Sequence, residues 1–428
     1  MTNGDAAGKP PSDLRTAADL IAGADLDGAR RAIRDTAVRT PTLACQEVAE
    51  AANTKVALKA ECLQGTGSFK LRGALSKVAA LGQRGSSGLV TASAGNHARA
   101  VAQAARLTGV GCEVFMPRDA SVSKVAAVER LGASVELGGA SVEEALGLAG
   151  KRAHSTGAAL VHPFDDLDVI AGQGTLGLEL LEDVPDLARV LVPIGGGGLA
   201  SGVGIALAKA HAKVELVGVQ ARACAPYVQA LQGAASTIEV SSASEATVAP
   251  GATIADGIAI TRPGRLTLPL LRELLDALQT VTEDEIADAM VFLADRAKLV
   301  AEGAGAVAVA ALLSGRMAPV SGTTVAIVSG GNVDSGLLAG LLRRRETEEG
   351  RRVRIFTRVP DRPGGLAELL NVVAGARANL LNLEHVREAV ALNVQETGVA
   401  LTLQTRGPAH TEELLAALAG AGYEVGLD

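Results

Sequence analysis

The stretch VLVPIGGGGLASG (residues 190–202) places four consecutive glycines between an apolar run and an Ala-rich run. VLVPI is typical of a buried strand, and the segment after the glycines is typical of a helix. Glycines let successive backbone N–H groups point into one cavity, and a helix N-terminus adds partial positive charge. A flexible linker is the alternative, but linkers rarely join a buried strand to a helix. We therefore expect a phosphate-binding loop made of Gly195, Gly196, Gly197, Gly198 and Leu199.

A dinucleotide is the competing ligand for this loop. Gly195, Gly197 and Ala200 almost match the G-x-G-x-x-A pattern. The next strand, VELVGVQ, ends at Gln220, where a dinucleotide site needs an Asp or Glu for the ribose. A phosphate-bearing cofactor without a ribose therefore fits the loop better.

The rest of the chain repeats this alternation of short apolar runs and Ala-rich runs. Its 428 residues are 48% hydrophobic but 2% aromatic, so its cores are built from Ala, Val, Leu and Ile, and its length suits two or three domains. We expect helices over 14–34, 96–108, 121–131 and 142–155. We expect strands over 56–58, 88–90, 112–116, 134–137, 160–161, 189–193, 215–219 and 324–328. This pattern predicts an α/β fold with largely parallel sheets that are covered on both faces.

The pattern changes after residue 352. Strands are expected over 353–358, 379–386, 399–404 and 423–426, with helices from 366 and over 411–419. This β-α-β-β-α-β order is that of the ferredoxin-like fold. The expected organisation is a disordered N-terminus (1–12), a main domain (13–342) with a smaller subdomain at about 85–170, a solvated linker with charges of both signs (343–352) and a small domain (353–428).

Charge and cysteine content exclude several classes of protein. The net charge is -7 and no long basic stretch occurs, so nucleic acid is not expected as a partner. The four cysteines form no C-x-x-C pair, which argues against zinc and disulfides and favours a cytoplasmic protein. The uncharged segment 190–208 contains a proline and the four glycines, so it is not expected to cross a membrane.

Three further motifs contain polar groups at expected element ends. TASAGNH (91–97) joins a strand to a helix whose free N–H groups suit a carboxylate, although a helix cap by Ser93 or Asn96 explains it equally well. VSGGN (328–332) ends a strand in a turn that contains Ser329. GTGSFKLRGA (65–74) holds a lysine beside one of only five phenylalanines, and an ordinary surface lysine is the alternative.

Together these motifs resemble the fold-type II pyridoxal phosphate enzymes of the tryptophan synthase β superfamily, and most closely the threonine ammonia-lyases (threonine dehydratases). The tail RVPDRPGGLAELLN (358–371) resembles an ACT regulatory domain. The stretches that match the lyases run in family order: RTPTL (39–43), GSFKLRGA (67–74), SAGNHA (93–98), PFDDLDVIAGQGTLGLE (163–179), PIGGGGLASG (193–202), TIADGIAI (253–260), AEGAGA (301–306) and SGGNVD (329–334).

The resemblance implies a role for each motif toward pyridoxal 5'-phosphate. Lys70 would hold the cofactor covalently and then act as base on the substrate Cα proton, while Phe69 would pack against the ring. Asn96 would bind the ring hydroxyl and Ser329 would face the ring nitrogen. The Gly195–Leu199 loop would bind the phosphate. Glu302, at the start of an expected helix, is interpreted only as an electrostatic cap.

The resemblance also implies the reaction. Loss of water from the substrate gives an aminoacrylate-type enamine, whose imine form is hydrolysed to a 2-oxo acid and ammonia. L-threonine gives 2-oxobutanoate and L-serine gives pyruvate, and the reaction serves either as the first step toward isoleucine or in threonine catabolism. Serine racemases of this superfamily carry a second serine where this chain has Ala94, so lyase activity is expected rather than racemase activity. Their metal-binding acidic segment corresponds to 220–226, which has no carboxylate, so no metal is expected. The substrate carboxylate would be held by Ser93, Ala94, Gly95, Asn96 and His97.

The ACT-like tail implies regulation by an amino-acid effector at an interface between paired domains, in a homotetramer or homodimer; dimerisation alone is the other interpretation. The positions expected at the effector site are Asp361, Arg362, Pro363, Gly364, Gly365 and Asn379. Three functions stay open. The first is threonine deamination. The second is another reaction on the same scaffold, either dehydration of serine or another β-hydroxy amino acid or a β-replacement. The third is a non-catalytic amino-acid sensor.

Overall fold

The computed structural model describes residues 16–232, 239–240, 253–387 and 395–427. The chain divides into two compact units, residues 1–333 and 334–428. The disorder predicted for residues 1–12 lies outside the described residues. Within the described residues, no helix is both long enough and apolar enough to cross a membrane.

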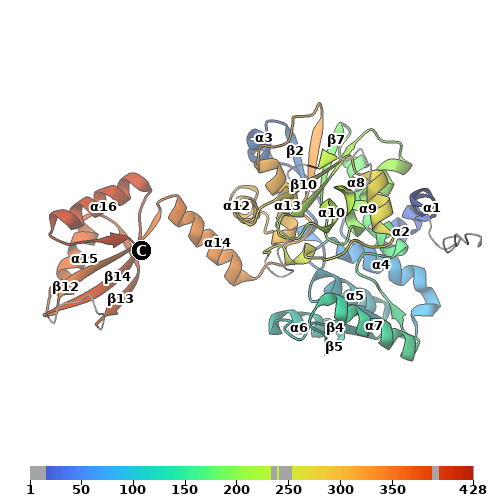
Figure 1. Cartoon of the computed structure of the whole chain (residues 1–428), viewed down its shortest axis with the longest axis horizontal. Coiled ribbons are helices and arrows are strands. Elements are labelled where there is room, and N and C mark those ends of the chain that lie inside the picture. The colour runs from blue at the N-terminus through green and yellow to red at the C-terminus, as the bar shows by residue number, and fades with distance from the viewer. Residues whose placement is uncertain (1–15, 233–238, 241–252, 388–394, 428) are drawn as a thin grey trace, which may run out of the picture. The chain divides into compact units, whose positions relative to one another are not determined.

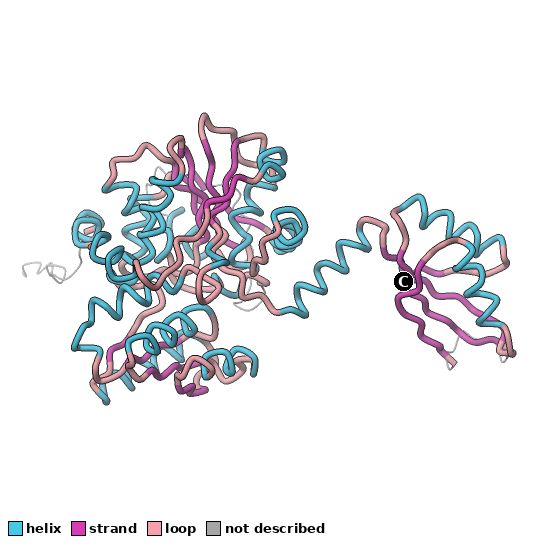
Figure 2. Tube along the Cα trace, turned by 180° about the vertical axis from the view of Figure 1, so that it is seen from behind, coloured by secondary structure: helices cyan, strands magenta, loops and turns pink. Residues whose placement is uncertain are grey.

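The larger unit is built on a seven-stranded sheet. Its order is β1-β2-β11-β7-β8-β10-β9, and all neighbours are parallel except the edge pair β1–β2. Helices cover both faces of this sheet, so its strands are continuous apolar runs (Figure 2). The strands are β1 (Thr42–Ala44), β2 (Lys55–Lys59), β7 (Leu187–Pro193), β8 (Glu215–Ala221), β9 (Glu239–Val240), β10 (Ala277–Val281) and β11 (Thr323–Ile327).

A second, smaller parallel sheet has the order β5-β4-β3-β6. Helices α5, α6 and α7 surround it (Figure 1). It lies within residues 85–170, where the smaller subdomain is expected. Its elements are β3 (Leu89–Ala92), α5 (Asn96–Thr108), β4 (Cys112–Met116), α6 (Val122–Glu129), β5 (Ser134–Leu137), α7 (Val142–Thr156) and β6 (Ala159–Leu160).

Glycines allow the central helices of the larger unit to approach closely. These helices are α4 (Lys70–Leu81), α8 (Leu167–Asp183) and α9 (Gly198–Lys209). A Cβ on Gly172 would lie 2.6 Å from the carbonyl oxygen of Arg72, and one on Gly202 would lie 2.4 Å from that of Ile170. Such backbone contacts replace bulky side chains, which explains how a chain with few aromatic residues packs a core.

The remaining helices of the larger unit differ from the sequence prediction at one point. The single helix expected over 14–34 is two helices, because the Asp25 side chain accepts a hydrogen bond from the Gly28 amide and starts a new helix. The helices are α1 (Ala17–Gly23), α2 (Leu26–Ile33), α3 (Gln46–Ala52), α10 (Pro226–Gln232), α11 (Thr267–Leu274), α12 (Glu283–Phe292) and α13 (Gly303–Leu313). Short helical turns are Glu61–Leu63, Gly82–Gly85, Asp256–Ile258 and, as a π-helix, Leu293–Ala297.

The smaller unit has the predicted β-α-β-β-α-β order. Its sheet order, β13-β14-β12-β15, is that of the ferredoxin-like fold, and leucine and valine side chains of both helices pack on the sheet in one core. The elements are β12 (Arg352–Pro360), α15 (Gly365–Gly375), β13 (Asn379–Val386), β14 (Glu396–Gln404), α16 (Pro408–Gly420) and β15 (Gly426–Leu427).

The mixed-charge segment 343–352, predicted as a solvated linker, is helical over its first part. Helix α14 spans Ser335–Glu348 and includes the first six of residues 343–352. Its charges lie four residues apart: Arg344 pairs with Glu348 at 2.8 Å and Arg345 with Glu349 at 2.9 Å. Such pairs stabilise an exposed helix by a few tenths of a kcal/mol each, so the charge pattern supports a helix as well as solvation.

Candidate active site

One cavity of about 420 Å³ in the larger unit brings together the site residues that the sequence predicts there. The elements that form it start helices or end strands, where backbone groups are free. The predicted residues that line it are Phe69, Lys70, Ser93, Ala94, Gly95, Asn96, His97, Gly195, Gly196, Gly197, Gly198, Leu199 and Ser329.

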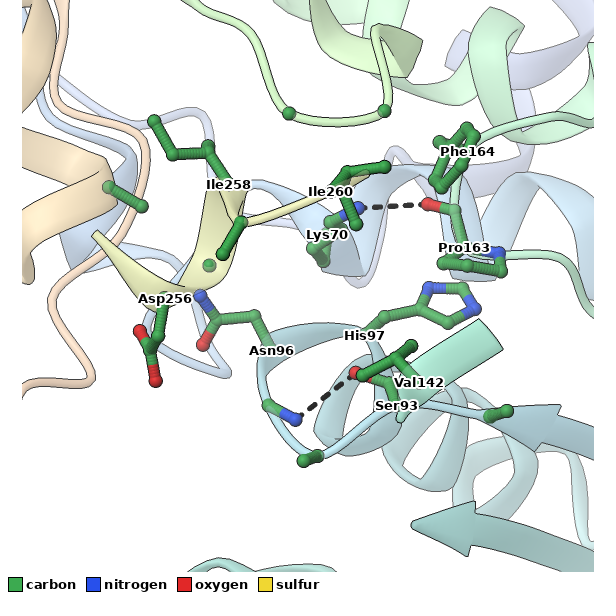
Figure 3. A pocket seen from close by; sticks show the side chains of 18 of the residues that line it. Lys70, Ser93, Asn96, His97, Val142, Pro163, Phe164, Asp256, Ile258 and Ile260 are labelled. Atoms are coloured by element: carbon green, nitrogen blue, oxygen red, sulfur yellow. Dashed lines mark hydrogen bonds between the residues drawn. The ribbon is translucent and has the colours of Figure 1, made fainter. Parts of the chain in front are cut away.

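Lys70 lies at the first position of α4, and its amine points into the cavity (Figure 3). Its Nζ donates a hydrogen bond to the carbonyl oxygen of Pro163 at 2.8 Å and lies 5.2 Å from the centre of the Phe69 ring. Burial lowers the pKa of the amine to about 8, against the opposing attraction of Glu302. With such a pKa roughly one-tenth of the amine is neutral at pH 7, far more than for an ordinary lysine, and this neutral fraction is nucleophilic.

The turn before Lys70 is fixed to the end of β11. The Phe69 amide donates to the Ser329 carbonyl at 3.1 Å, and the Gly331 amide donates to the Gly67 carbonyl at 2.9 Å. Gly67 has a φ of +77°, which a side chain would strain. These bonds place the lysine and Ser329 on the same cavity. The Ser329 hydroxyl is buried and donates to the Ala304 carbonyl at 3.3 Å.

The glycine loop forms a cradle of backbone groups. The Gly196 carbonyl accepts hydrogen bonds from Tyr227 Oη at 2.9 Å and Thr267 Oγ1 at 2.8 Å. Because the peptide is trans, the N–H of Gly197 points away from these partners. The loop has no room for side chains: a Cβ on Gly196 would lie 2.2 Å from the Phe164 ring, and one on Gly197 would lie 2.5 Å from Tyr227 Oη. The first N–H groups of α9 have no acceptor within the helix and suit a phosphate.

The second loop ends at the N-terminus of α5. Its helix cap is Gly95, whose amide donates to Ser93 Oγ at 3.1 Å, so neither Ser93 nor Asn96 caps the helix with its side chain. His97 Nε2 lies 3.1 Å from the Val161 carbonyl, and its buried Nδ1 has no partner in the described part of the chain. Burial lowers the pKa of His97 to about 3, so the imidazole is neutral.

The sequence prediction missed the contact that Glu302 makes on this cavity. The Glu302 side chain makes no helix-cap hydrogen bond; instead its Oε1 accepts one from Asn96 Nδ2 at 2.5 Å. Burial raises the pKa of Glu302 to about 7, with the nearby charge of Asp256 adding to the effect. The signal in the sequence is a single charged residue within AEGAGA, next to an otherwise apolar helix.

These residues fit pyridoxal phosphate. The neutral form of the amine suits the carbonyl carbon of the cofactor. A glycine loop whose surroundings leave no room for a Cβ suits its phosphate, and a hydroxyl and an amide suit its ring heteroatoms. Among the described residues no group of three His, Cys, Asp or Glu side chains could hold a metal ion.

Comparison with known proteins also points to a pyridoxal phosphate enzyme. The family model of pyridoxal-phosphate dependent enzymes matches residues 33–330. This chain belongs to that family. The L-threonine ammonia-lyase of Thermotoga maritima is 43% identical over 404 residues, which is 94% of this chain and 98% of the relative. The L-threonine ammonia-lyase of Geobacter sulfurreducens is 41% identical over 95% of this chain and 98% of its own length.

Solved structures agree on the fold of the larger unit. The threonine deaminase of T.th. has a TM-score of 0.65 at 38% identity, over 72% of this chain and 97% of its own. Maize serine racemase has a TM-score of 0.68 at 34% identity, over 76% of this chain and 98% of its own. The α/β fold, the pyridoxal phosphate dependence and the membership in the lyases are therefore confirmed.

The six positions expected at the effector site lie in the smaller unit, and one chain does not bring them together. The turn 361–365 follows β12 at the end where Pro360 pairs with Glu396, whereas Asn379 pairs with Gln404 at the opposite end of the sheet. The β12 strand between these ends has nine residues, and its eight steps of ~3.3 Å span roughly 26 Å. A site that uses both ends therefore needs two copies of the chain.

Proposed function

We propose that this chain is a pyridoxal phosphate-dependent L-threonine ammonia-lyase, which converts L-threonine to 2-oxobutanoate and ammonia and, more weakly, L-serine to pyruvate. The observation that carries the proposal is that Lys70, the glycine loop and Ser329 line one cavity of about 420 Å³. The chain is 43% and 41% identical to two L-threonine ammonia-lyases over nearly its full length, which supports the same reaction.

When bound, pyridoxal phosphate supplies an electron-withdrawing ring conjugated to the substrate nitrogen, which acidifies the Cα–H bond. The Lys70 amine, with its lowered pKa, removes the Cα proton. The Gly195–Leu199 loop would hold the phosphate. The amides of Ser93 and Gly95 donate within the protein, so the N–H groups of Ala94, Asn96 and His97 would hold the substrate carboxylate. Ser329 would place a neutral hydroxyl rather than a carboxylate beside the ring nitrogen, so the ring would withdraw electrons less strongly.

The first experiment measures 2-oxo acid release by the purified, cofactor-loaded protein with L-threonine, L-serine or D-serine. We expect 2-oxobutanoate from L-threonine, less pyruvate from L-serine, and no product from Lys70→Ala. Lys55→Ala is the control, because the Lys55 side chain is 76% exposed on β2. No oxo acid from any substrate would overturn the reaction and favour replacement chemistry or sensing on the same scaffold.

For the smaller unit we propose an ACT-like regulatory role in a cytoplasmic homodimer or homotetramer. Its ferredoxin-like fold and the separation of Asp361–Gly365 from Asn379 support an amino-acid effector bound between two chains. Titration of the full chain with free amino acids should change kcat/KM for L-threonine, and Asn379→Ala should remove the response while leaving the rate without effector unchanged. A response of equal size in that variant would place the effector elsewhere.

A further inference from the structure

Four polar side chains form one continuous row beside the cavity. Arg99 Nη1 donates to Asn332 Oδ1 at 2.6 Å, Asn332 Nδ2 donates to Asn96 Oδ1 at 2.7 Å, and Asn96 Nδ2 donates to Glu302 Oε1 at 2.5 Å. The row joins α5, the turn after β11 and the start of α13. None of these contacts joins neighbours in the sequence, so the row exists only in the folded chain.

The Arg99 end of the row fixes its direction. A guanidinium only donates, so Asn332 must present its oxygen to Arg99 and its nitrogen to Asn96, and Asn96 then presents its nitrogen to Glu302. The second N–H of Asn332 is taken by the Thr66 carbonyl at 2.9 Å. Asn96 therefore keeps one N–H. Figure 3 shows its amide extending from α5 into the cavity, on the side of Asp256 and Ile258.

The buried position of Glu302 is energetically unfavourable. Its carboxyl is buried, and in the part of the chain that the structure describes no Lys or Arg forms an ion pair with it. Its close approach needs Gly330, because a Cβ there would lie 2.2 Å from Glu302 Oε1. A buried carboxyl group without an ion pair is destabilising, and this one makes no helix-cap hydrogen bond.

We propose that Glu302 and Asn332 are positioning residues that fix the amide of Asn96, so that its remaining N–H is held for the ring hydroxyl of the cofactor. The inference rests on the cofactor site of the proposed function, and it assigns both residues a role without contact with the substrate. Arg99 anchors the far end of the row.

The test uses the absorption spectrum of the bound cofactor and its dissociation constant, neither of which needs turnover. Asn96→Ala should shift the absorption maximum and weaken pyridoxal phosphate binding about tenfold, as expected for a lost hydrogen bond to a partly charged group. Glu302→Leu removes the acceptor at similar volume and should reproduce most of this change. Glu302→Gln keeps an acceptor for Asn96 and should restore most of the wild-type values. Asp119→Asn, on the same cavity, is the control.

The double variant Asn96→Ala/Glu302→Leu distinguishes positioning from a general effect on folding. If Glu302 acts through Asn96, the double variant should bind no more weakly than Asn96→Ala alone. Additive losses, or a wild-type spectrum and affinity in Glu302→Leu, would overturn the inference. Should Glu302→Leu not fold, Asn332→Ala tests the same row from its other side with the same two outcomes. If the variants change the absorption maximum and the cofactor affinity as expected, but the wild-type protein releases no oxo acid, only the proposed reaction is refuted.

Discussion

Arg72, two residues after Lys70, should be worth several kcal/mol to the stability of the larger unit. Its guanidinium is fully buried and bonds Glu61 through Nε at 2.9 Å and Nη2 at 2.8 Å. It also bonds Glu179 through Nη1 at 2.7 Å and Nη2 at 3.0 Å. Arg72→Met leaves Glu61 buried, with Thr40 Oγ1 at 2.5 Å as its remaining direct hydrogen-bond donor. Removing one partner of a buried ion pair costs about 3–5 kcal/mol, and we expect that loss here.

Urea unfolding followed by far-UV circular dichroism measures this loss, since the chain has no tryptophan for fluorescence. Arg39→Met is the control: Arg39 also pairs with two carboxylates, Glu182 and Asp183, but its side chain is 48% exposed, so the loss should stay below ~1 kcal/mol. Adding Glu61→Leu to Arg72→Met should recover part of the stability, because the unpaired charge is then gone. An Arg72→Met variant as stable as Arg39→Met would refute the reasoning.

Three further predictions concern the cavity. Reductive methylation of Lys70 in the cofactor-free chain should rise with pH through a midpoint near 8, because only the neutral amine reacts; a midpoint near 10.5 would contradict the lowered pKa. Gly197→Ala should weaken pyridoxal phosphate binding at least tenfold, since its φ is +88° and its Cβ would meet Tyr227 Oη, whereas Gly147→Ala, in open space on α7, should bind normally in the same titration. Ala94→Ser places a hydroxyl on the cavity wall and should add measurable conversion of L-serine to D-serine, detected by chiral chromatography; lyase activity with no D-serine would show that the hydroxyl is insufficient.

The alternation of short strand-like runs and Ala-rich runs predicted several elements of the larger unit. Residues 112–116 and 134–137 form strands with the predicted bounds, and α5 spans the predicted 96–108. The strand Ala277–Val281 was missed, although ALQTV is no shorter and no more polar than the predicted strand SVEL (134–137). Its assignment depends on pairing with β8, which the sequence of the strand itself does not contain.

The candidate site was predictable only as separate motifs. The glycine loop was interpreted as a phosphate site from its own residues, whereas the roles of Lys70 and Ser329 were implied only by the resemblance to a known family. Their common cavity, and the bond from Asn96 to a carboxyl 206 residues later, depend on tertiary structure. For the same reason Glu302 was interpreted as a helix cap: its sequence neighbours predict a helix start, and its partner lies on another element.

Two buried glutamates of the larger unit, Glu61 and Glu302, show why the surroundings, and not burial alone, decide the protonation of a carboxyl group. Burial raises the pKa of both, but in Glu61 the charge and hydrogen bonds of Arg72 outweigh it and lower the pKa below its ordinary value. Among the described residues Glu302 has one close hydrogen-bond donor, the Asn96 amide, and its pKa rises to about 7. Glutamine at 61 would leave Glu179 as the carboxylate bonded to Arg72 and would take one charge out of a buried ion-pair cluster. Glutamine at 302 would still accept the bond from Asn96. We therefore expect position 61 to need a charge and position 302 to need only an acceptor.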